Sequence, residues 1–329
     1  MKKNFTTPIL LALAIATSVT LVSLSKHSVS ASNLSMAATA QQAVVLPRTN
    51  IFALTNGNQL FVLRPGQTTF SQVGTISGIG IGTQVIGMDF RASNGQLYAL
   101  TDTGVIYTLN TSSAAATQVS TLNPTFRGGV QSLFDFNTVV DAVRIIGSNT
   151  QNYAAVGAQL NTTAVQTSLA YAAGDRNAGT TPNIVGGAYS NSLAGATVTI
   201  FYMVDSATSS LVTIAQKNAT GSSNTGGGQL QTIGQIFDNN LNAQNGGRPV
   251  NITPTADLDI FTDPVTRVDT ALLVTGNRLI AFNPIQVNQN LRVGQSQNLG
   301  GAGISLGNTT GLNFIDVAAQ PAAATQASR

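Results

Sequence analysis

The chain of 329 residues lacks most of the side chains on which enzymes rely. It contains no cysteine, no tryptophan and no glutamate, so all 12 acidic residues are aspartates, and its one histidine is His27. Without histidine or cysteine beyond that position, a Ser-His-Asp triad, a Cys-His pair and a histidine-bound zinc are all excluded there. The lack of cysteine also excludes disulfides, so burial of apolar side chains must hold the fold.

Residues 1–31 have the composition of a secretory signal peptide. Two lysines near the start precede an apolar stretch from Ile9 to Leu24, and Val29 and Ala31 supply small residues before a cleavage site. A membrane-spanning helix needs about 20 apolar residues, and this stretch is shorter and contains hydroxyl side chains. We therefore expect a cleaved signal helix rather than a membrane anchor, and no later segment is long or apolar enough to cross a bilayer. The predicted location is extracellular, periplasmic or associated with the cell surface.

Removal of the signal peptide changes the charge balance. It takes away Lys2, Lys3 and Lys26 and leaves 11 arginines and Lys217 against 12 aspartates, a net charge of zero. Non-specific binding of nucleic acid needs clustered cations that neutralise many phosphates, whereas these arginines are spread singly along the chain. The sequence therefore predicts no nucleic-acid partner.

Short apolar runs recur at regular spacing after a polar segment, 32–50, which we interpret as a linker that leads into the first strand. The run IFALT at 51–55 returns 46 residues later as LYALT at 97–101. In both copies a turn, two further apolar runs and a strand containing Asp-Phe follow, at Asp89-Phe90 and Asp135-Phe136. Three more units open at residues 143, 201 and 271.

Four short runs per unit, with a period in the forties, are typical of a four-stranded propeller blade. The runs are almost continuously apolar, which indicates strands buried on both faces, as in stacked blades. We predict an all-β chain that forms a single β-propeller of about five four-stranded blades over residues 51–317, with six blades or a β-solenoid as the alternative. Residues 318–329 are predicted to be a disordered tail.

The segments 86–92 and 95–100 resemble the repeat of the domain of unknown function 4394 family, which occurs in exported bacterial proteins. The similarity covers about residues 50–317 and continues in three further segments, of which the last is the most specific: 134–137, 141–146 and 187–197. Two departures occur where the family usually has a proline and an Asp-Arg pair, because this chain has Thr138 and Asp141-Ala142 there. The resemblance implies an exported propeller-like repeat protein, and it carries over no catalytic residue.

The densest polar cluster of the apolar region consists of Asp135, Asn137, Asp141 and Arg144. At the mouth of a blade these side chains would line a central binding site. Alternatively, an Arg–Asp pair and an asparagine that closes a turn would satisfy buried polar atoms. The second interpretation is favoured, because an aspartate and an arginine occupy a similar place in the preceding unit.

A second candidate lies at Asp257 and Asp259, whose carboxylates share one face of a strand, with Asp263 four residues further on. Such oxygens suit a hard cation, above all calcium, or an aspartate pair for hydrolysis. The glycine-centred calcium-loop pattern is missing, which favours aspartates that simply bind backbone N–H groups. We therefore expect no cofactor and a fold that does not depend on a metal, with calcium as the one alternative.

Two functions compete. The missing catalytic residue types and the neutral surface favour a non-catalytic extracellular binding or structural module, whose partner would be an extracellular or cell-surface ligand held by loops. The alternative is an aspartate- or calcium-dependent hydrolase or lyase, acting on carbohydrate or lactone substrates in the centre of the propeller. The hydrolase or lyase requires aspartates from different blades to converge in one pocket, whereas the binding module does not.

Export predicts cleavage after Ala31, because the basic, apolar and small-residue regions follow one another in the order that signal peptidase requires. The protein recovered outside the cytoplasm should have the intact mass of a chain that begins at Ser32. Recovery of the full-length mass would contradict this expectation.

Overall fold

The computed structural model describes residues 46–129, 131–238, 248–276, 278–284, 298–305 and 314–321. The predicted signal peptide, most of the predicted linker and residues 322–329 of the predicted tail lie outside these ranges. Within them the chain consists of β-strands and one short 3-10 helix, Thr225–Gly227. No helix in this part of the chain is long and apolar enough to cross a membrane.

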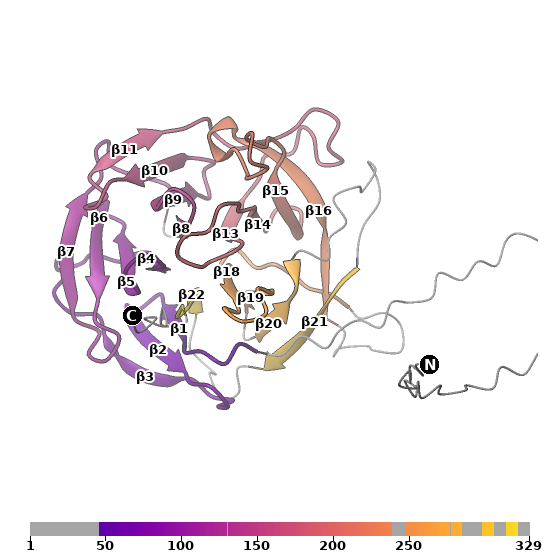
Figure 1. Ribbon diagram of the computed structural model, residues 1–329. Helices are drawn as coiled ribbons and strands as arrows, with labels where there is room; N and C mark the ends of the chain where they lie inside the picture. The colour runs from indigo at the N-terminus through magenta and orange to yellow at the C-terminus, as the bar shows by residue number, and fades with distance from the viewer. Residues whose placement is uncertain are drawn as a thin grey trace, which may run out of the picture. The chain divides into compact units, whose positions relative to one another are not determined.

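Five four-stranded antiparallel blades form a ring, with the first strand of each blade nearest the centre (Figure 1). The prediction of a five-bladed propeller is confirmed. The first blade consists of β22 (Phe314–Ala319), β1 (Ile51–Thr55), β2 (Gln59–Leu63) and β3 (Ser71–Thr75). The second consists of β4 (Val85–Arg91), β5 (Gln96–Thr101), β6 (Val105–Leu109) and β7 (Ala116–Thr121). The third consists of β8 (Ser132–Asn137), β9 (Ala142–Gly147), β10 (Asn152–Val156) and β11 (Thr162–Val165).

The fourth and fifth blades are joined at their outer edges. The fourth consists of β13 (Ile184–Tyr189), β14 (Phe201–Asp205), β15 (Ser210–Ile214) and β16 (Gln229–Asp238). The fifth consists of β18 (Asp257–Thr262), β19 (Asp269–Thr275), β20 (Arg278–Phe282) and β21 (Asn298–Ser305). The long strand β16 pairs in parallel with β21, and it also binds the short strands β12 (Ala170–Tyr171) and β17 (Arg248–Pro249).

The ring is closed by β22, the last strand in the described part of the chain. β22 pairs antiparallel with β1, with Val317 opposite Ala53, so the first blade combines both ends of the described chain. Gln320 N–H then donates to Asn50 O at 2.8 Å, which extends the ordered contacts past the predicted boundary at residue 317. The sequence repeat is therefore offset by one strand from the blade: the strand that ends each repeat, such as the Asp-Phe strands β4 and β8, is the innermost strand of the following blade.

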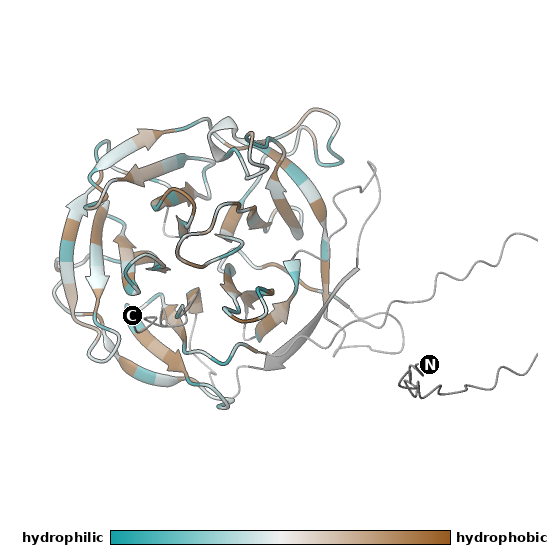
Figure 2. Ribbon diagram, in the orientation of Figure 1, coloured by the Kyte–Doolittle hydropathy of each residue, from teal (hydrophilic) through white to brown (hydrophobic). Residues whose placement is uncertain are grey.

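The core lies between the blades rather than within any one of them. Alternate residues of a strand face opposite neighbours: Ile51 and Ala53 pack against the fifth blade, whereas Phe52 and Leu54 pack against the second. The described apolar residues form one such cluster at each of the five contacts between adjacent blades. This confirms that both faces of the inner strands are buried, while outer strands such as β3 and β7 carry exposed hydrophilic residues (Figure 2).

Crowding near the centre leaves no room for a side chain at Gly87 of β4. A Cβ there would lie 2.7 Å from Phe134 Cβ and 2.8 Å from Ser132 O of the third blade. Gly57, in the exposed turn between β1 and β2, would place its Cβ no closer than 3.8 Å to any neighbour.

The replacement Gly87→Ala should therefore destabilise the ring by about 1–3 kcal/mol, the usual cost of an overpacked core. Gly57→Ala, which adds the same methyl group, should leave the stability nearly unchanged. Thermal unfolding of both variants beside the parent protein measures the difference, and equal melting temperatures for the two variants would contradict the packing described.

A candidate site on the propeller axis

Four of the five innermost strands carry aspartates that reach across to the next blade. Each accepts a hydrogen bond from a backbone N–H of the neighbouring innermost strand. The pairs are Met88 N to Asp316 Oδ2 at 3.0 Å, Phe136 N to Asp89 Oδ2 at 2.8 Å, Tyr189 N to Asp135 Oδ1 at 2.9 Å, Val317 N to Asp257 Oδ2 at 3.0 Å and Ala319 N to Asp259 Oδ2 at 2.5 Å. These bonds satisfy N–H groups on strand edges that have no further strand beside them.

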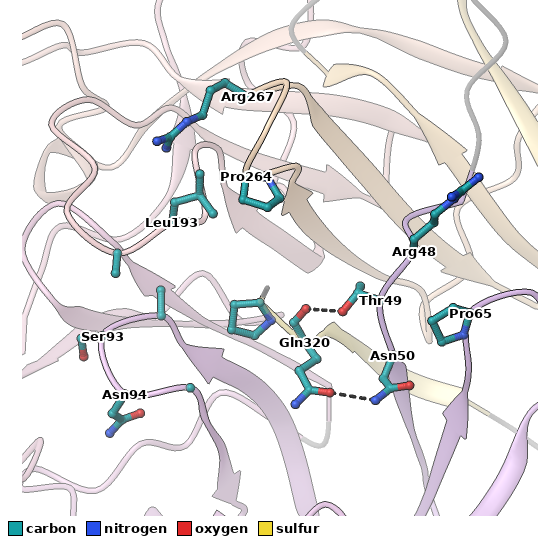
Figure 3. Close-up of a pocket in the computed structure, with 14 residues that line it drawn as sticks. Arg48, Thr49, Asn50, Pro65, Ser93, Asn94, Leu193, Pro264, Arg267 and Gln320 are labelled. Carbon is teal, nitrogen blue, oxygen red and sulfur yellow. Dashed lines mark hydrogen bonds between the residues drawn. The ribbon is translucent and has the colours of Figure 1, made fainter. Parts of the chain in front are cut away.

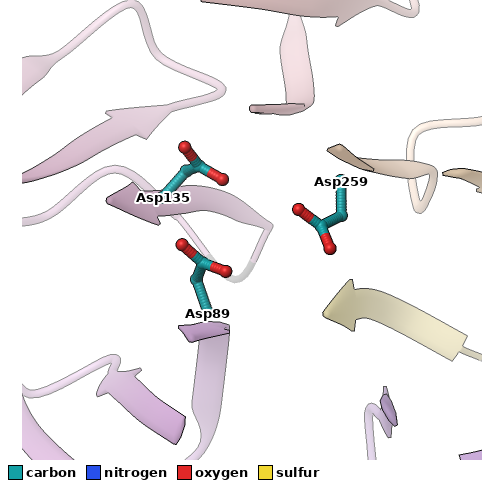
Figure 4. A group of neighbouring side chains, drawn as sticks. All are labelled: Asp89, Asp135 and Asp259. Carbon is teal, nitrogen blue, oxygen red and sulfur yellow. The ribbon is translucent and has the colours of Figure 1, made fainter. Parts of the chain in front are cut away.

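Three of these carboxylates, from Asp89, Asp135 and Asp259, meet at one point. They come from β4, β8 and β18, and one oxygen of each lies within 4.8 Å of the other two (Figure 4). All three residues are at least 92% buried. They line a cavity of about 20 Å³, which holds roughly one water molecule or one ion.

Asp89, Asp135 and Asp259 form a group that we call the axial aspartates, and their negative charges repel one another. Burial raises the pKa of Asp89 and Asp135 well above the ordinary range, and the neighbouring aspartates raise it further. Burial likewise raises the pKa of Asp257 to about 8 and of Asp259 to about 6, although backbone N–H groups work against it. No hydrogen bond or ion pair joins these carboxylates to a lysine or arginine in the part of the chain that the structure describes.

The polar cluster predicted from residues 135–144 is divided by the fold. Only Asp135 reaches the axis. Asn137 Oδ1 accepts the N–H of Val139 at 3.0 Å within the turn after β8. Asp141 lies in the same turn and forms an ion pair with Arg91 of the preceding blade at 2.7 Å, while Arg144 donates to Asn152 Oδ1 at 2.8 Å and to the Tyr189 hydroxyl at 3.4 Å.

The group predicted around residues 257–263 is divided as well. Asp257 and Asp259 both reach β22, as their common face requires. Asp263 lies in the turn between β18 and β19, where its Oδ1 accepts the N–H groups of Val265 and Thr266 at 2.9 and 2.8 Å. It takes no part in the axial group.

Sequence reasoning did not place Asp89 or Asp316 among the candidate site residues. The signal was present, because both stand in the strand that ends a repeat, as Asp135 does. In a closed ring, equivalent positions of successive innermost strands face the same axis, so a recurring aspartate must approach its counterparts. The fourth blade breaks the series, since Ala188 precedes the Tyr189 that binds Asp135.

One end of the axis is closed by the side chain of Gln131, just before β8. Its Nε2 contacts backbone oxygens of three other innermost segments, those of Val185, Ala256 and Ile315, at 3.4, 3.3 and 2.7 Å. The carboxylates are therefore approached from the opposite end, where the innermost strands finish.

A wide hollow of about 860 Å³ lies at that opposite end (Figure 3). It shares Ala92 and Pro321 with the small cavity of the axial aspartates, so the two adjoin. Loops from the first, second, fourth and fifth blades line it, with Arg48 and Arg267 as its two basic side chains. The axis thus combines a space for a single ion with a space for a much larger ligand.

The raised pKa values predict that the metal-free protein becomes less stable as the pH rises. A carboxyl group whose folded pKa exceeds its unfolded value of about 3.9 stabilises the fold below that value, and the stabilisation is lost as the pH passes the folded pKa. The folded values of about 6 for Asp259 and about 8 for Asp257 set the window. The free energy of unfolding should therefore fall between about pH 4 and pH 8.

Urea unfolding in a chelator at pH 5 and pH 8 measures this fall. Beyond His27 the sequence has no histidine that would titrate in the same range. Asp257→Asn keeps an acceptor for Val317 N–H and should flatten the pH dependence. A stability that rises with pH in the parent protein would contradict the assignment.

Comparisons with known proteins identify the family of the chain. A search of curated proteins finds no match. Among solved structures, the chain is similar to one from the nidogen/laminin complex (11% identity, TM-score 0.46, 83% of this chain and 98% of that one). It is also similar to the Malassezia sympodialis allergen Mala s 1 (13%, 0.43, 84% and 81%) and to a Bacteroides thetaiotaomicron protein of unknown function (15%, 0.42, 84% and 63%). The sequence profile described as domain of unknown function (DUF4394) matches residues 59–318, so the chain belongs to that family.

Proposed function

We propose that this protein is an exported, non-catalytic binding module that holds an extracellular or cell-surface ligand in the hollow at the open end of the axis. The observation that carries the proposal is the size of the hollow. Its volume of about 860 Å³ is within the range of about 300–1,000 Å³ usual for ligand pockets. A ring of blades that presents loops from four blades around one hollow suits such a role.

The lining of the hollow indicates the chemistry of the ligand. Arg48 and Arg267 are exposed and lie at separate places around it, and Thr49, Asn50 and Asn94 line other parts with amide and hydroxyl groups (Figure 3). Arginine binds carboxylates through two parallel hydrogen bonds, and amides bind hydroxyl groups. We therefore propose a polar ligand with hydroxyl and carboxylate groups, of which an acidic saccharide is the simplest example.

The convergence of Asp89, Asp135 and Asp259 is the observation that favours the alternative, an aspartate-dependent hydrolase or lyase. Neighbouring carboxyl groups with separated pKa values are a common acid–base arrangement. However, a cavity of about 20 Å³ admits no sugar ring, and the three residues are at most 8% exposed. The difference in size between the two spaces favours binding over hydrolysis.

Binding of an array of acidic and neutral saccharides to the exported protein tests the proposal. Arg267→Ala should weaken saturable binding of an acidic saccharide at least about 10-fold, because a charge-assisted pair contributes about 1.5–3 kcal/mol. Arg127→Ala removes an exposed arginine that does not line the hollow and should leave binding unchanged.

Equal losses in Arg267→Ala and Arg127→Ala, or no saturable binding by the parent protein, would contradict the proposed site. The same saccharides are then examined for cleavage products. Turnover that disappears in Asp259→Asn would favour the hydrolase instead.

A further inference from the structure

The axial aspartates concentrate negative charge in a place that water barely reaches. Asp89, Asp135 and Asp259 accept hydrogen bonds only from backbone N–H groups among the described contacts, and Asp257 and Asp316 lie close enough to act on their charges. Buried charges of one sign require a compensating positive charge. In a group without lysine or arginine, that charge has to come from a proton or from a bound cation.

An unpartnered oxygen belongs to the same group. Asp316 is 2% exposed, and its Oδ2 accepts the N–H of Met88, but its Oδ1 is buried without any hydrogen-bond partner. Asp316 lies on β22, between the strands that carry Asp259 and Asp89, and close enough to interact electrostatically with both carboxylates. A buried carboxylate oxygen without a donor is rare in native proteins and calls for a ligand.

We propose that Asp89, Asp135 and Asp259 bind one calcium ion on the propeller axis. Calcium lies 2.3–2.6 Å from its ligands, so two oxygens of one ion stand up to about 5 Å apart, which agrees with oxygens that all lie within 4.8 Å of one another. Carboxylate oxygens with no histidine or cysteine nearby suit a hard cation rather than a transition metal.

The size of the cavity distinguishes between magnesium and calcium, the two common hard cations. Magnesium usually keeps several of its waters, and a space of about 20 Å³ has no room for them. Calcium accepts carboxylates through one or both oxygens in a flexible geometry, so three carboxylates supply three to six of its six to eight ligands without bound water. This site replaces the local group around residues 257–263 that the sequence indicated, and shares only Asp259 with it.

Isothermal titration of the exported protein with calcium chloride, after treatment with a chelator, tests the proposal. We expect one site per chain, with a Kd no weaker than about 1 mM, the weak end of extracellular calcium modules. Magnesium chloride should bind at least about 10-fold more weakly. Thermal unfolding should shift upward by several degrees in excess calcium, because the ion binds only the folded state. The absence of saturable binding by the parent protein would overturn the proposal.

Two variants separate a calcium ligand from a purely structural aspartate. Asp135→Asn keeps an oxygen for Tyr189 N–H but removes one negative charge, so calcium affinity should fall at least about 10-fold. In a chelator the same variant should melt at the same or a higher temperature, because one like charge has been removed. Asp263→Asn changes a carboxylate of the β18–β19 turn and should bind calcium as the parent does.

A lower melting temperature of Asp135→Asn in chelator with an unchanged calcium response would assign Asp135 a structural role and overturn the site. Equal losses of affinity in Asp135→Asn and Asp263→Asn would do the same. Calcium binding does not rest on the ligand proposed for the hollow, since each titration can succeed or fail without the other.

Discussion

The inner edges of the five central strands impose the constraint on which the rest of the structure depends. A sheet edge carries backbone N–H groups that need an acceptor, and a ring of blades turns five such edges toward an axis with little water. Aspartates on β4, β8, β18 and β22 supply acceptors to the next strand around the ring. One set of side chains thereby joins adjacent blades at the point where hydrophobic packing between them ends.

The use of aspartates as acceptors for these N–H groups places several carboxylates together in a buried region. The cost is mutual repulsion and desolvation, which the raised pKa values of Asp89, Asp135 and Asp316 express. Buried charges of one sign persist only when a proton or a cation compensates them. The aspartates that join adjacent blades therefore also create an environment suited to a hard cation.

The wide hollow at the open end of the axis adjoins the small cavity of the axial aspartates. Gln131 closes the other end of the axis. A cation held in the small cavity would also fix the ends of β4 and β18, from which loops that line the hollow depart. The positions of Arg267 and Asn94 thus depend on the same strands that hold Asp259 and Asp89.

The sequence by itself determined an all-β chain of about five repeats, the four strands of each repeat and the burial of both faces of the inner strands. These follow from local patterns. The return of IFALT as LYALT gives the length of the repeat, and continuous apolar runs indicate strands that are buried on both faces. Closure of the ring fixed the number of blades at five. Only the tertiary structure decided where each blade begins, since the pairing of β22 with β1 joins segments from opposite ends of the chain. It alone also showed that Asp89 meets Asp259, 170 residues away, and that Asp141 pairs with Arg91 rather than with Arg144. The physical reason is that a periodic pattern specifies which residues face inward, whereas the contacts between inward-facing polar groups are set by closure of the ring.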